Sequence, residues 1–548
     1  MMLKSFSFFE RAQALSHMNE DLVYDLVIIG GGINGAGVAR DAAQRGLKVL
    51  LLEKSDFASG TSSRSSKLIH GGIRYLENLE FKLVFEALSE RSKLFEMAPH
   101  LVHPLRFLIP LYKGGRVQPL MMGLGMWLYD ALSLFQAPEL NEYLSATKAL
   151  QQYENLRGQD LLGSFRYSDA YMDDDRLTIE TLRSANDDGA TAINYAKVSK
   201  VTHLSQRLFQ VQFEDVLSGV TKSVKAKHLV SCLGPWTDIF WQTQKQEKFL
   251  SQPILRPTKG IHLTLSQERF PLRSAVVMAA EKRIVFAIPR HDMVIIGTTD
   301  TDYSGDPGRV RVENEDVEYI IQVLQNYFPK ANIQRSDFIS GYAGVRPLVA
   351  DGSASEGKTS REHTILSRNG ITFVAGGKYT TYRLMSEQIV DACLKEFSIE
   401  EKSRLRRSQT HLPMNPLVDV ETMQLSHLWV QHLRRMTRLP LSEIEFLVSR
   451  YGKEVTTFEI PSKDQTLWQI EARQAIRNTM CLSLVDFMTR RTPLFLSSPD
   501  HGIFHLPQIM RVFSEELKWS PAQQEQERKS YLEYIQNELH WKNDNAKR

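Results

Sequence analysis

The sequence predicts an α/β unit followed by a helical region, and three observations lead to this prediction. An apolar run at residues 24–30 stops at glycines, and a helix-like stretch then leads to a second apolar run. Between about residues 190 and 300, apolar and polar residues alternate in short runs, which is typical of strands. From about residue 385 onward, apolar residues recur with helical spacing.

The first elements can be assigned in order. Residues 24–30 predict a buried strand, residues 34–45 a helix and residues 48–53 a second strand. Gly46 lies where the glycine that follows a helix is expected. A strand, a helix and a second strand of this kind form one parallel unit of an α/β sheet.

Length and composition bound the remaining possibilities. A chain of 548 residues is longer than one hydrophobic core usually supports, so we expect more than one domain. A formal net charge of +3 without a basic stripe argues against nucleic-acid binding. The three cysteines are far apart, so we expect neither a disulfide framework nor a metal site. The first residues lack the apolar core of a secretory signal, which favours the cytoplasm.

The glycine-rich loop after the first strand has the spacing GxGxxG, with Gly30, Gly32 and Gly35. Such a loop allows a tight turn, close approach of a pyrophosphate, and close packing of the helix on the strand. Glu53 ends the second strand, where a carboxylate can accept the hydroxyls of a ribose. The loop and the acid together predict a dinucleotide site for NAD or FAD, and analogy with long flavoproteins favours FAD.

A second loop, GTSSRSSKLIHGGIRYL, spans residues 60–76 and is rich in hydroxyls and cations. Short hydrogen-bonding side chains beside a Gly-Gly pair suit the close approach of a large polar ligand. We therefore expect this loop to contact the same ligand as the first one.

Residues 117–135 carry a single charge, Asp130, and are about long enough to cross a bilayer. Pro119 and two glycines interrupt the segment. It can be a membrane-spanning helix, a helix on the membrane surface or a helix of the core. For the surface alternative, Met126 and Trp127 are the expected membrane contacts.

Six motifs occur in order along the chain: DLVIIGGGINGAG, TSSRSSKLIHGGIRYL, GPW, IGTTDTDY, GVRPL and GGKYTTYR. Together they resemble the bacterial FAD-dependent glycerol-3-phosphate dehydrogenases, which are relatives of D-amino-acid oxidase and sarcosine oxidase. The likeness runs from about residue 20 into the C-terminal helices. Many flavoproteins share the glycine loop, whereas HGGxRYL, GVRP and GGKxTTYR in this order are far more specific.

The resemblance implies a Rossmann-like FAD-binding domain with a strand-rich, D-amino-acid-oxidase-like substrate cap and a C-terminal helical domain. We expect an N-terminal extension over residues 1–20, the FAD domain over residues 21–405 and the helical domain over residues 406–548. The cap would take roughly residues 90–160 and 240–345.

The resemblance also implies an activity. It is the FAD-dependent oxidation of sn-glycerol 3-phosphate to dihydroxyacetone phosphate, by hydride transfer to flavin N5, with electrons passed to a membrane quinone. The protein would be cytoplasmic and peripheral, on the inner face of the cell membrane. Because the sequence shows no histidine motif that would clearly tether FAD, we expect noncovalent binding of the cofactor. The sequence leaves the oligomeric state open, a homodimer included.

The phosphate of such a substrate needs convergent cations. The candidates lie in or near glycine-bearing loops and are Arg74, Arg346, Arg361 and Lys378, with the Tyr75 hydroxyl beside them. His70 is the expected base for the C2 hydroxyl, unless it only contacts the flavin. Arg346 can also stabilise a developing alkoxide, and Lys259 is a further catalytic candidate.

The remaining candidates are the residues that the motifs and the resemblance place against FAD. They are Gly30, Gly31, Gly32, Ile33, Asn34, Gly35, Glu53, Lys54, Thr61, Ser62, Ser63, Ser65, Ser66, Lys67, Leu68, Ile69, His70, Gly71, Gly72, Val198, Gly234, Trp236, Gly377, Lys378, Thr380 and Thr381.

Three other functions share some of these features. A glycerol-3-phosphate oxidase would pass electrons to oxygen and make peroxide, and some such enzymes carry an insertion that is not apparent between Tyr382 and Pro413. An amine or hydroxy-acid oxidoreductase of the same fold would need fewer cations. A flavoprotein that binds tRNA would need a basic surface.

Overall fold

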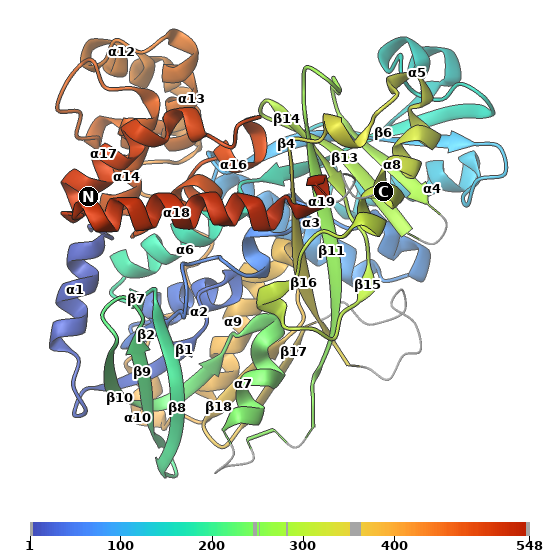
Figure 1. The fold of residues 1–548 in the computed structure, drawn as a ribbon. Helices are drawn as coiled ribbons and strands as arrows, with labels where there is room; N and C mark the ends of the chain where they lie inside the picture. Colours follow the sequence, from blue (N-terminus) through green and yellow to red (C-terminus); the bar gives the residue numbers. More distant parts are fainter. Residues whose placement is uncertain (1–3, 245–248, 251, 281–282, 351–362, 544–548) are drawn as a thin grey trace.

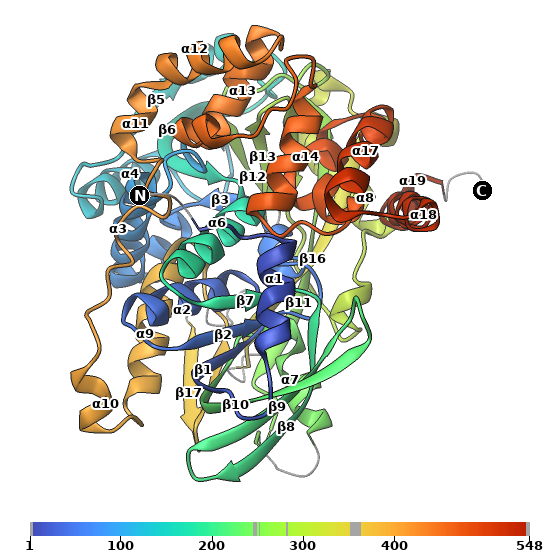
Figure 2. The same cartoon turned by 90° about the vertical axis from the view of Figure 1, so that its left-hand side faces the viewer.

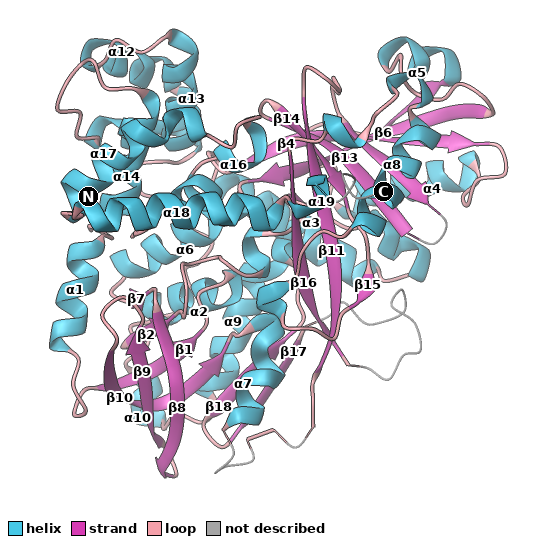
Figure 3. Cartoon of the chain, viewed as in Figure 1, coloured by secondary structure: helices cyan, strands magenta, loops and turns pink. Residues whose placement is uncertain are grey.

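The structure is a computed structural model, and it describes residues 4–244, 249–250, 252–280, 283–350 and 363–543. Two β-sheets and a group of C-terminal helices make up the fold, as the colouring in Figure 3 shows. In Figure 1 the first sheet lies at the lower left, the second at the upper right and the C-terminal helices at the upper left.

The first sheet contains β1 (Val23–Ile29), β2 (Val49–Leu52), β7 (Thr191–Ile193), β8 (Ala196–Ser205), β9 (Leu208–Asp215), β10 (Val220–Ser231), β17 (Thr364–Arg368) and β18 (Ile371–Ala375). Its main order is β17-β18-β10-β1-β2-β7. From β18 to β7 the strands pair in parallel, β17 adds an antiparallel edge, and β8 and β9 continue from β10 as an antiparallel ribbon. The predicted α/β unit is confirmed to within one residue at each end.

Alternate residues of β1 face opposite sides of this sheet, and both sides are buried. Leu26 and Ile28 pack under α2 (Ile33–Gln44), α6 (Asp174–Asp187) and α9 (Tyr382–Leu394). Val27 and Ile29 pack on the other side, with α1 (Phe8–His17), the β8–β9 ribbon and α7 (Thr237–Thr243). A strand that is covered on both faces reads as a continuous apolar run, which is the pattern seen in the sequence. Figure 2 shows α2, α6 and α9 to one side of the strands and α1 to the other.

The second sheet contains β3 (Leu68–Ile69), β4 (Val102–Tyr112), β5 (Glu142–Ser145), β6 (Leu161–Met172), β11 (Leu255–Ser266), β12 (Ala275–Ala280), β13 (Arg283–Arg290), β14 (Met293–Gly297), β15 (Thr301–Asp302) and β16 (Ser340–Val349). Its main order is β15-β11-β14-β13-β12-β4-β6-β3, with β16 beside β11 and β5 beside β6. On β11, Ile261, Leu263 and Leu265 enter a core together with residues of α8 (Asn314–Tyr327). The opposite face of β11 is left for the site described below.

Helices dominate the end of the chain, as the sequence predicts. They are α10 (Ile399–Ser403), α11 (Val420–Gln424), α12 (Ser426–Met436), α13 (Leu441–Tyr451), α14 (Leu467–Asn478), α15 (Leu484–Asp486), α16 (Leu494–Ser497), α17 (Leu506–Leu517), α18 (Pro521–Glu538) and α19 (His540–Asn543). The long α18 crosses from this group toward the second sheet (Figure 1). Arg64 donates to the Glu538 carboxylate at 3.1 Å, which ties the end of α18 to the loop before β3.

Residues 117–135 form α4 (Pro119–Leu132), which packs near α3 (Phe81–Met97) on the second sheet; α5 (Ala146–Gln152) follows it. Fourteen residues rise only about 21 Å, which is less than the hydrocarbon core of a bilayer. Among the described residues, none of the helices has the length and apolarity needed to cross a membrane. The membrane-spanning alternative for this segment is therefore wrong.

The two faces of α4 differ sharply. Leu120, Leu124 and Trp127 are 78%, 59% and 61% exposed, whereas Met126 and Tyr129 are buried. The expectation that Met126 contacts a membrane is wrong, because its side chain belongs to the core under the helix. The expectation for Trp127 remains compatible with its exposure.

A buried carboxylate joins the first sheet to the C-terminal helices. Asp56, just after β2, accepts hydrogen bonds from Arg490 at 2.7 Å and from Arg491 at 2.8 and 2.9 Å. Burial alone would raise the pKa of Asp56, but the Arg491 and Arg490 guanidinium groups lower it below its ordinary value. All three side chains are at least nine-tenths buried, so loss of one partner leaves charge without compensation.

We expect the Asp56→Ala variant to lose about 3–5 kcal/mol of stability, because two guanidinium groups would stay buried without their carboxylate. Thermal unfolding followed by circular dichroism checks this, with a drop of several degrees in Tm. Asp464→Ala is the control, since Asp464 pairs with Arg438 at an exposed position and such pairs contribute about 1 kcal/mol or less. Equal Tm values for the two variants would contradict the role assigned to Asp56.

Candidate functional site

A large cavity lies between the two sheets, with a volume of about 2030 Å³. Residues of the first sheet and its loops line one part, and residues of β11, β13 and β16 line another. Pockets for single small molecules usually measure about 300–1,000 Å³, so this cavity has room for a large ligand beside a small one.

The glycine loop forms one end of the cavity. Gly30 has a φ of +111°, and a Cβ on Gly35 would lie 1.9 Å from the Gly30 carbonyl oxygen. The loop therefore tolerates no side chain at either position, and α2 starts in direct contact with the end of β1. The Ile33 amide at the start of α2 donates to the Ser62 hydroxyl at 2.9 Å. Amides at a helix N-terminus, with a hydroxyl beside them, favour a pyrophosphate at this position.

Glu53 lines the same end of the cavity. Its two carboxylate oxygens accept the amides of Gly31 at 2.7 Å and Ser55 at 2.9 Å. Burial raises the pKa of Glu53, although these two amides oppose the shift. Each oxygen keeps further lone pairs, so the carboxylate is oriented to accept hydroxyl groups such as those of a ribose.

Aromatic and backbone surfaces continue the cavity beyond Glu53. Lys54 lies 4.0 Å above the ring of Trp236, and both residues line the wall together with Val198 and Gly234. The sequence-based candidates of this region thus all line the cavity, although they come from just after β2, from β8 and from the turn after β10.

The HGG loop (His70, Gly71 and Gly72) at the other end is held by Thr380, Tyr129 and Asp169. The Thr380 hydroxyl accepts the His70 amide at 3.2 Å and lies 3.3 Å from the His70 carbonyl. The Gly71 amide donates to the Tyr129 hydroxyl at 3.0 Å, and Tyr129 in turn donates to Asp169 at 2.7 Å. Gly71 has no room for a Cβ, which would lie 2.5 Å from both Leu88 and the Tyr129 hydroxyl. His70 itself lines the cavity in a fixed loop.

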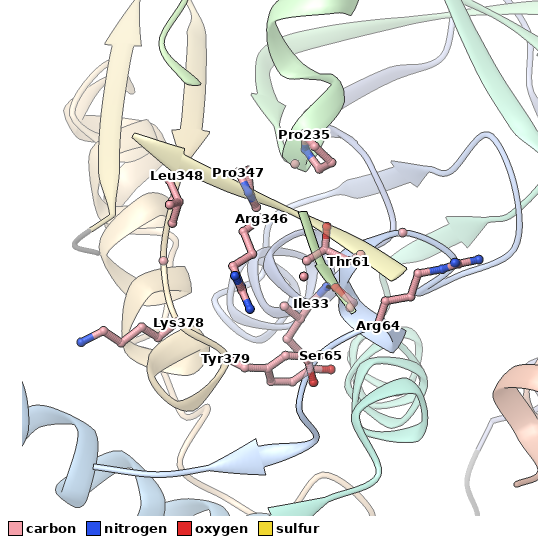
Figure 4. Close-up of a pocket in the computed structure, with 18 of the residues that line it drawn as sticks. Ile33, Thr61, Arg64, Ser65, Pro235, Arg346, Pro347, Leu348, Lys378 and Tyr379 are labelled. Carbon is pink, nitrogen blue, oxygen red and sulfur yellow. Dashed lines mark hydrogen bonds between the residues drawn. The ribbon is translucent and has the colours of Figure 1, made fainter. Parts of the chain in front are cut away.

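Arg346 reaches into the cavity from β16 and is among the lining residues that Figure 4 labels. Its guanidinium donates to the Asp300 carboxylate at 2.6 Å and to the Thr298 hydroxyl at 2.9 Å. Lys378, from the loop before α9, places its ammonium 3.7 Å from the centre of the Tyr75 ring. Arg361 and the side chain of Arg74 lie outside what the structure describes.

Lys259 does not line the cavity with the other catalytic candidates. Gly260 and His262 face the cavity, and neighbouring residues of a strand point to opposite sides. The Lys259 ammonium pairs instead with Asp316 of α8 at 2.6 Å. A role for Lys259 at the reacting centre would require this buried pair to break.

Several cofactor candidates lie behind the wall rather than in it. Lys67 is 1% exposed, and its ammonium contacts Asp174 and, at 3.6 Å, Asp175. Its charge holds the loop to α6 and is directed away from the cavity. The candidates outside the lining are Gly31, Gly35, Ser63, Lys67, Ile69, Gly71 and Thr381.

The structure adds lining residues that the sequence reasoning missed, among them Arg64, His262, Thr298 and Asp300. Arg64 lies inside a quoted motif but ties the loop to the Ala343 carbonyl and Glu538. Thr298 and Asp300 also lie in a quoted motif, IGTTDTDY, so the sequence could have indicated them as site residues. Among the described residues, no group of three or more His, Cys, Asp or Glu side chains is placed to hold a metal.

Comparison with known families identifies this architecture. The family of FAD dependent oxidoreductases matches residues 25–383, and the C-terminal domain of alpha-glycerophosphate oxidase matches residues 421–524. The aerobic glycerol-3-phosphate dehydrogenase of Bacillus subtilis is 35% identical over 98% of this chain and 99% of that protein. The enzyme of the same name from Staphylococcus haemolyticus is 35% identical over 87% of this chain and 90% of its own length.

Solved structures agree with the sequence comparison. The glycerol-3-phosphate dehydrogenase from Bacillus halodurans, solved with FAD, has a TM-score of 0.78 at 27% identity, covering 97% of this chain and 98% of that chain. Glycine oxidase from Geobacillus kaustophilus, at 19% identity and a TM-score of 0.52, covers 69% of this chain and 96% of its own and shows the shared fold. The chain belongs to the FAD-dependent oxidoreductase family and, within it, to the family of the aerobic glycerol-3-phosphate dehydrogenases.

Proposed function

We propose that this protein oxidises sn-glycerol 3-phosphate to dihydroxyacetone phosphate with FAD as its cofactor. The observation that carries the proposal is one cavity that joins a dinucleotide-binding loop to Arg346, in a chain that aligns over 98% of its length with an aerobic glycerol-3-phosphate dehydrogenase. Arg346 and Lys378 line the end of the cavity away from the glycine loop. An arginine and a lysine together suit the phosphate of a small phosphorylated alcohol better than they suit a single amino-acid carboxylate.

FAD fits the cavity in one direction. The amides at the start of α2 and the Ser62 hydroxyl would hold the pyrophosphate, and Glu53 would hold the adenosine ribose. The flavin half would then extend toward the HGG loop and the loop before α9. We include noncovalent binding in the proposal, because the sequence offers no clear tethering histidine motif.

At the reacting end, the chain supplies a phosphate site and a proton acceptor. Arg346 and Lys378 would bind the phosphate, together with Arg74 and Arg361. Asp300 and Thr298 fix the plane of the Arg346 guanidinium, which makes a fork-shaped contact with phosphate or alkoxide geometrically specific. His70, held through its backbone by Thr380, would take the C2 hydroxyl proton. FAD, when bound, supplies the hydride acceptor for C2.

The proposed electron acceptor is a membrane quinone, reached from the cytoplasmic side. Exposed apolar side chains gather on the turn after Tyr75, on the start of α3, on α4 and just after the end of α4. They are Leu79, Phe81, Phe85, Leu120, Met121, Leu124, Trp127, Leu134 and Phe135, which we call the α4 patch. Ile73 and Tyr75, in the turn that adjoins this patch, also line the cavity. A membrane held at the α4 patch would lie close to the reacting end of the cavity.

A glycerol-3-phosphate oxidase is the second candidate function, because the family that matches residues 421–524 carries that name. The stretch between Tyr382 and Pro413 contains only α9 and the short α10, so no inserted domain separates the two parts of the chain. This favours the dehydrogenase, and the reaction with oxygen distinguishes the two.

The first prediction concerns the cofactor and the substrate together. The purified protein should be yellow, and anaerobic addition of sn-glycerol 3-phosphate should bleach its visible absorption. For a dehydrogenase, recolouring should be slow in air and fast with a soluble quinone. Fast recolouring in air with release of peroxide would establish the oxidase, and a spectrum unchanged by the substrate would contradict the proposed substrate.

The second prediction concerns Arg346. The Arg346→Lys variant should keep its FAD but lose about a hundredfold in kcat/KM for sn-glycerol 3-phosphate, since lysine keeps the charge and loses the fork. Steady-state kinetics with a dye acceptor measures this. Arg309→Ala, which removes an 88% exposed arginine side chain, is the control. If the Arg346→Lys variant keeps the wild-type kcat/KM, the Arg346 guanidinium does not contact the substrate phosphate or the alkoxide.

The third prediction concerns the α4 patch. A Leu124→Glu/Trp127→Glu double variant should bind phospholipid vesicles at least tenfold more weakly, because two apolar side chains that enter the interface become charged. Vesicle flotation measures binding, and turnover with a water-soluble dye should persist. Phe504→Glu is the matched control, since Phe504 is 80% exposed on the C-terminal helices. If the wild type, the double variant and Phe504→Glu float equally with vesicles, the α4 patch is not the membrane contact.

A further inference from the structure

His262 lies on the cavity face of β11, two residues after Gly260 and on the same face. The Arg346 guanidinium packs directly against Gly260, where it would meet a Cβ. The His262 imidazole is 2% exposed and stacks on the Tyr342 ring, with 4.9 Å between centroids and 16° between planes. On β14, a Cβ at Gly297 would lie 2.3 Å from the imidazole. The ring therefore has a single orientation, clamped between Tyr342 and the Gly297 backbone.

One hydrogen bond connects this ring to the cavity. The Nε2 atom lies 2.9 Å from the Ser66 hydroxyl oxygen. The Nδ1 atom is buried and has no hydrogen-bond partner among the described residues. Ser66 lines the cavity together with Ser62, whose hydroxyl accepts the Ile33 amide at the start of α2, and with His70.

The ring is neutral, so it carries one proton on one of its nitrogens. Burial lowers the pKa of His262 well below its ordinary value, and the positive charges of Arg346 and Lys67 lower it further. A neutral imidazole can donate from Nε2 to Ser66, or it can accept there and carry its proton on Nδ1. The second arrangement would leave a buried N–H without an acceptor, which is rarer in proteins than an unpaired acceptor. The hydrogen-bond network thus assigns the proton to Nε2.

This assignment determines what Ser66 presents to a ligand. If Nε2–H donates to the Ser66 oxygen, the Ser66 hydroxyl hydrogen must point elsewhere, and the cavity is the side left to it. If instead the Ser66 hydroxyl donated its hydrogen to Nε2, its oxygen would offer the cavity only lone pairs. The imidazole therefore decides whether the cavity wall carries a donor or an acceptor at this point.

We propose that His262 is a positioning residue that turns the Ser66 hydroxyl into a hydrogen-bond donor toward the flavin half of FAD. The proposal rests on FAD as the cofactor and is independent of the substrate, so its test needs no turnover. His262 takes no proton from a substrate in this proposal, because its imidazole stays neutral and its Nε2 is already protonated.

The test compares five variants by FAD titration of the apo-protein, followed through flavin fluorescence. Ser66→Ala and His262→Phe should each weaken FAD binding by about five- to tenfold, the usual scale for one hydrogen bond. The double variant should lose no more than either single variant, since both remove the same contact. The visible absorption band of the bound flavin should shift in the same direction in all three.

Conservative variants separate the hydrogen bond from packing. In His262→Gln the amide nitrogen can take the place of Nε2, so FAD affinity should stay within about twofold of wild type. In His262→Asn the amide nitrogen reaches only the place of Nδ1, so this variant should bind FAD as weakly as His262→Phe. Wild-type FAD affinity in His262→Phe, additive losses in the double variant, or equal losses in the Gln and Asn variants would each overturn the proposal.

Discussion

The arrangement of the site depends on one backbone contact, between the Gly30 carbonyl and the Cα of Gly35. This contact leaves no room for a side chain on Gly35. Because the two backbones touch there, α2 leaves the end of β1 in a single direction. That direction points the first amides of the helix into the cavity, where Ser62 meets the amide of Ile33. The same loop offers the Gly31 amide to Glu53, so the acid that ends β2 is oriented by the turn that ends β1.

Buried charges form a second layer behind the cavity wall. Lys67 contacts Asp174, Asp56 holds Arg490 and Arg491, and each pair joins segments that are far apart in the sequence. Such pairs add little net stability over apolar residues of the same size, because their desolvation offsets their attraction. Their effect here is geometric: the ligand-contacting loops are held against helices that never enter the cavity.

The sequence was most informative where local rules decide the structure. The glycine loop, the helix after it and the acid at Glu53 follow from spacing, and all three lie where the spacing predicts. Side-chain direction in the second sheet was beyond such rules. Lys259 and His262 are close in the sequence, yet the register of β11 sends the first to Asp316 and the second to the cavity wall, against Ser66. The faces of α4 depend on tertiary packing in the same way, and Met126 is buried although Trp127 beside it is exposed.

The order of strands in the first sheet has a consequence for how the protein is made. β1 pairs with β10, and β10 pairs in parallel with β18, whose residues begin at Ile371. A chain that grows by about 5–20 residues per second needs roughly 7–29 seconds to pass from the end of β10 to the end of β18. During that time the edge of β10 that β18 will cover has no partner, and unpaired edges of apolar strands invite aggregation. Chaperone demand during synthesis should therefore be concentrated on this nascent sheet rather than on the helical end of the chain.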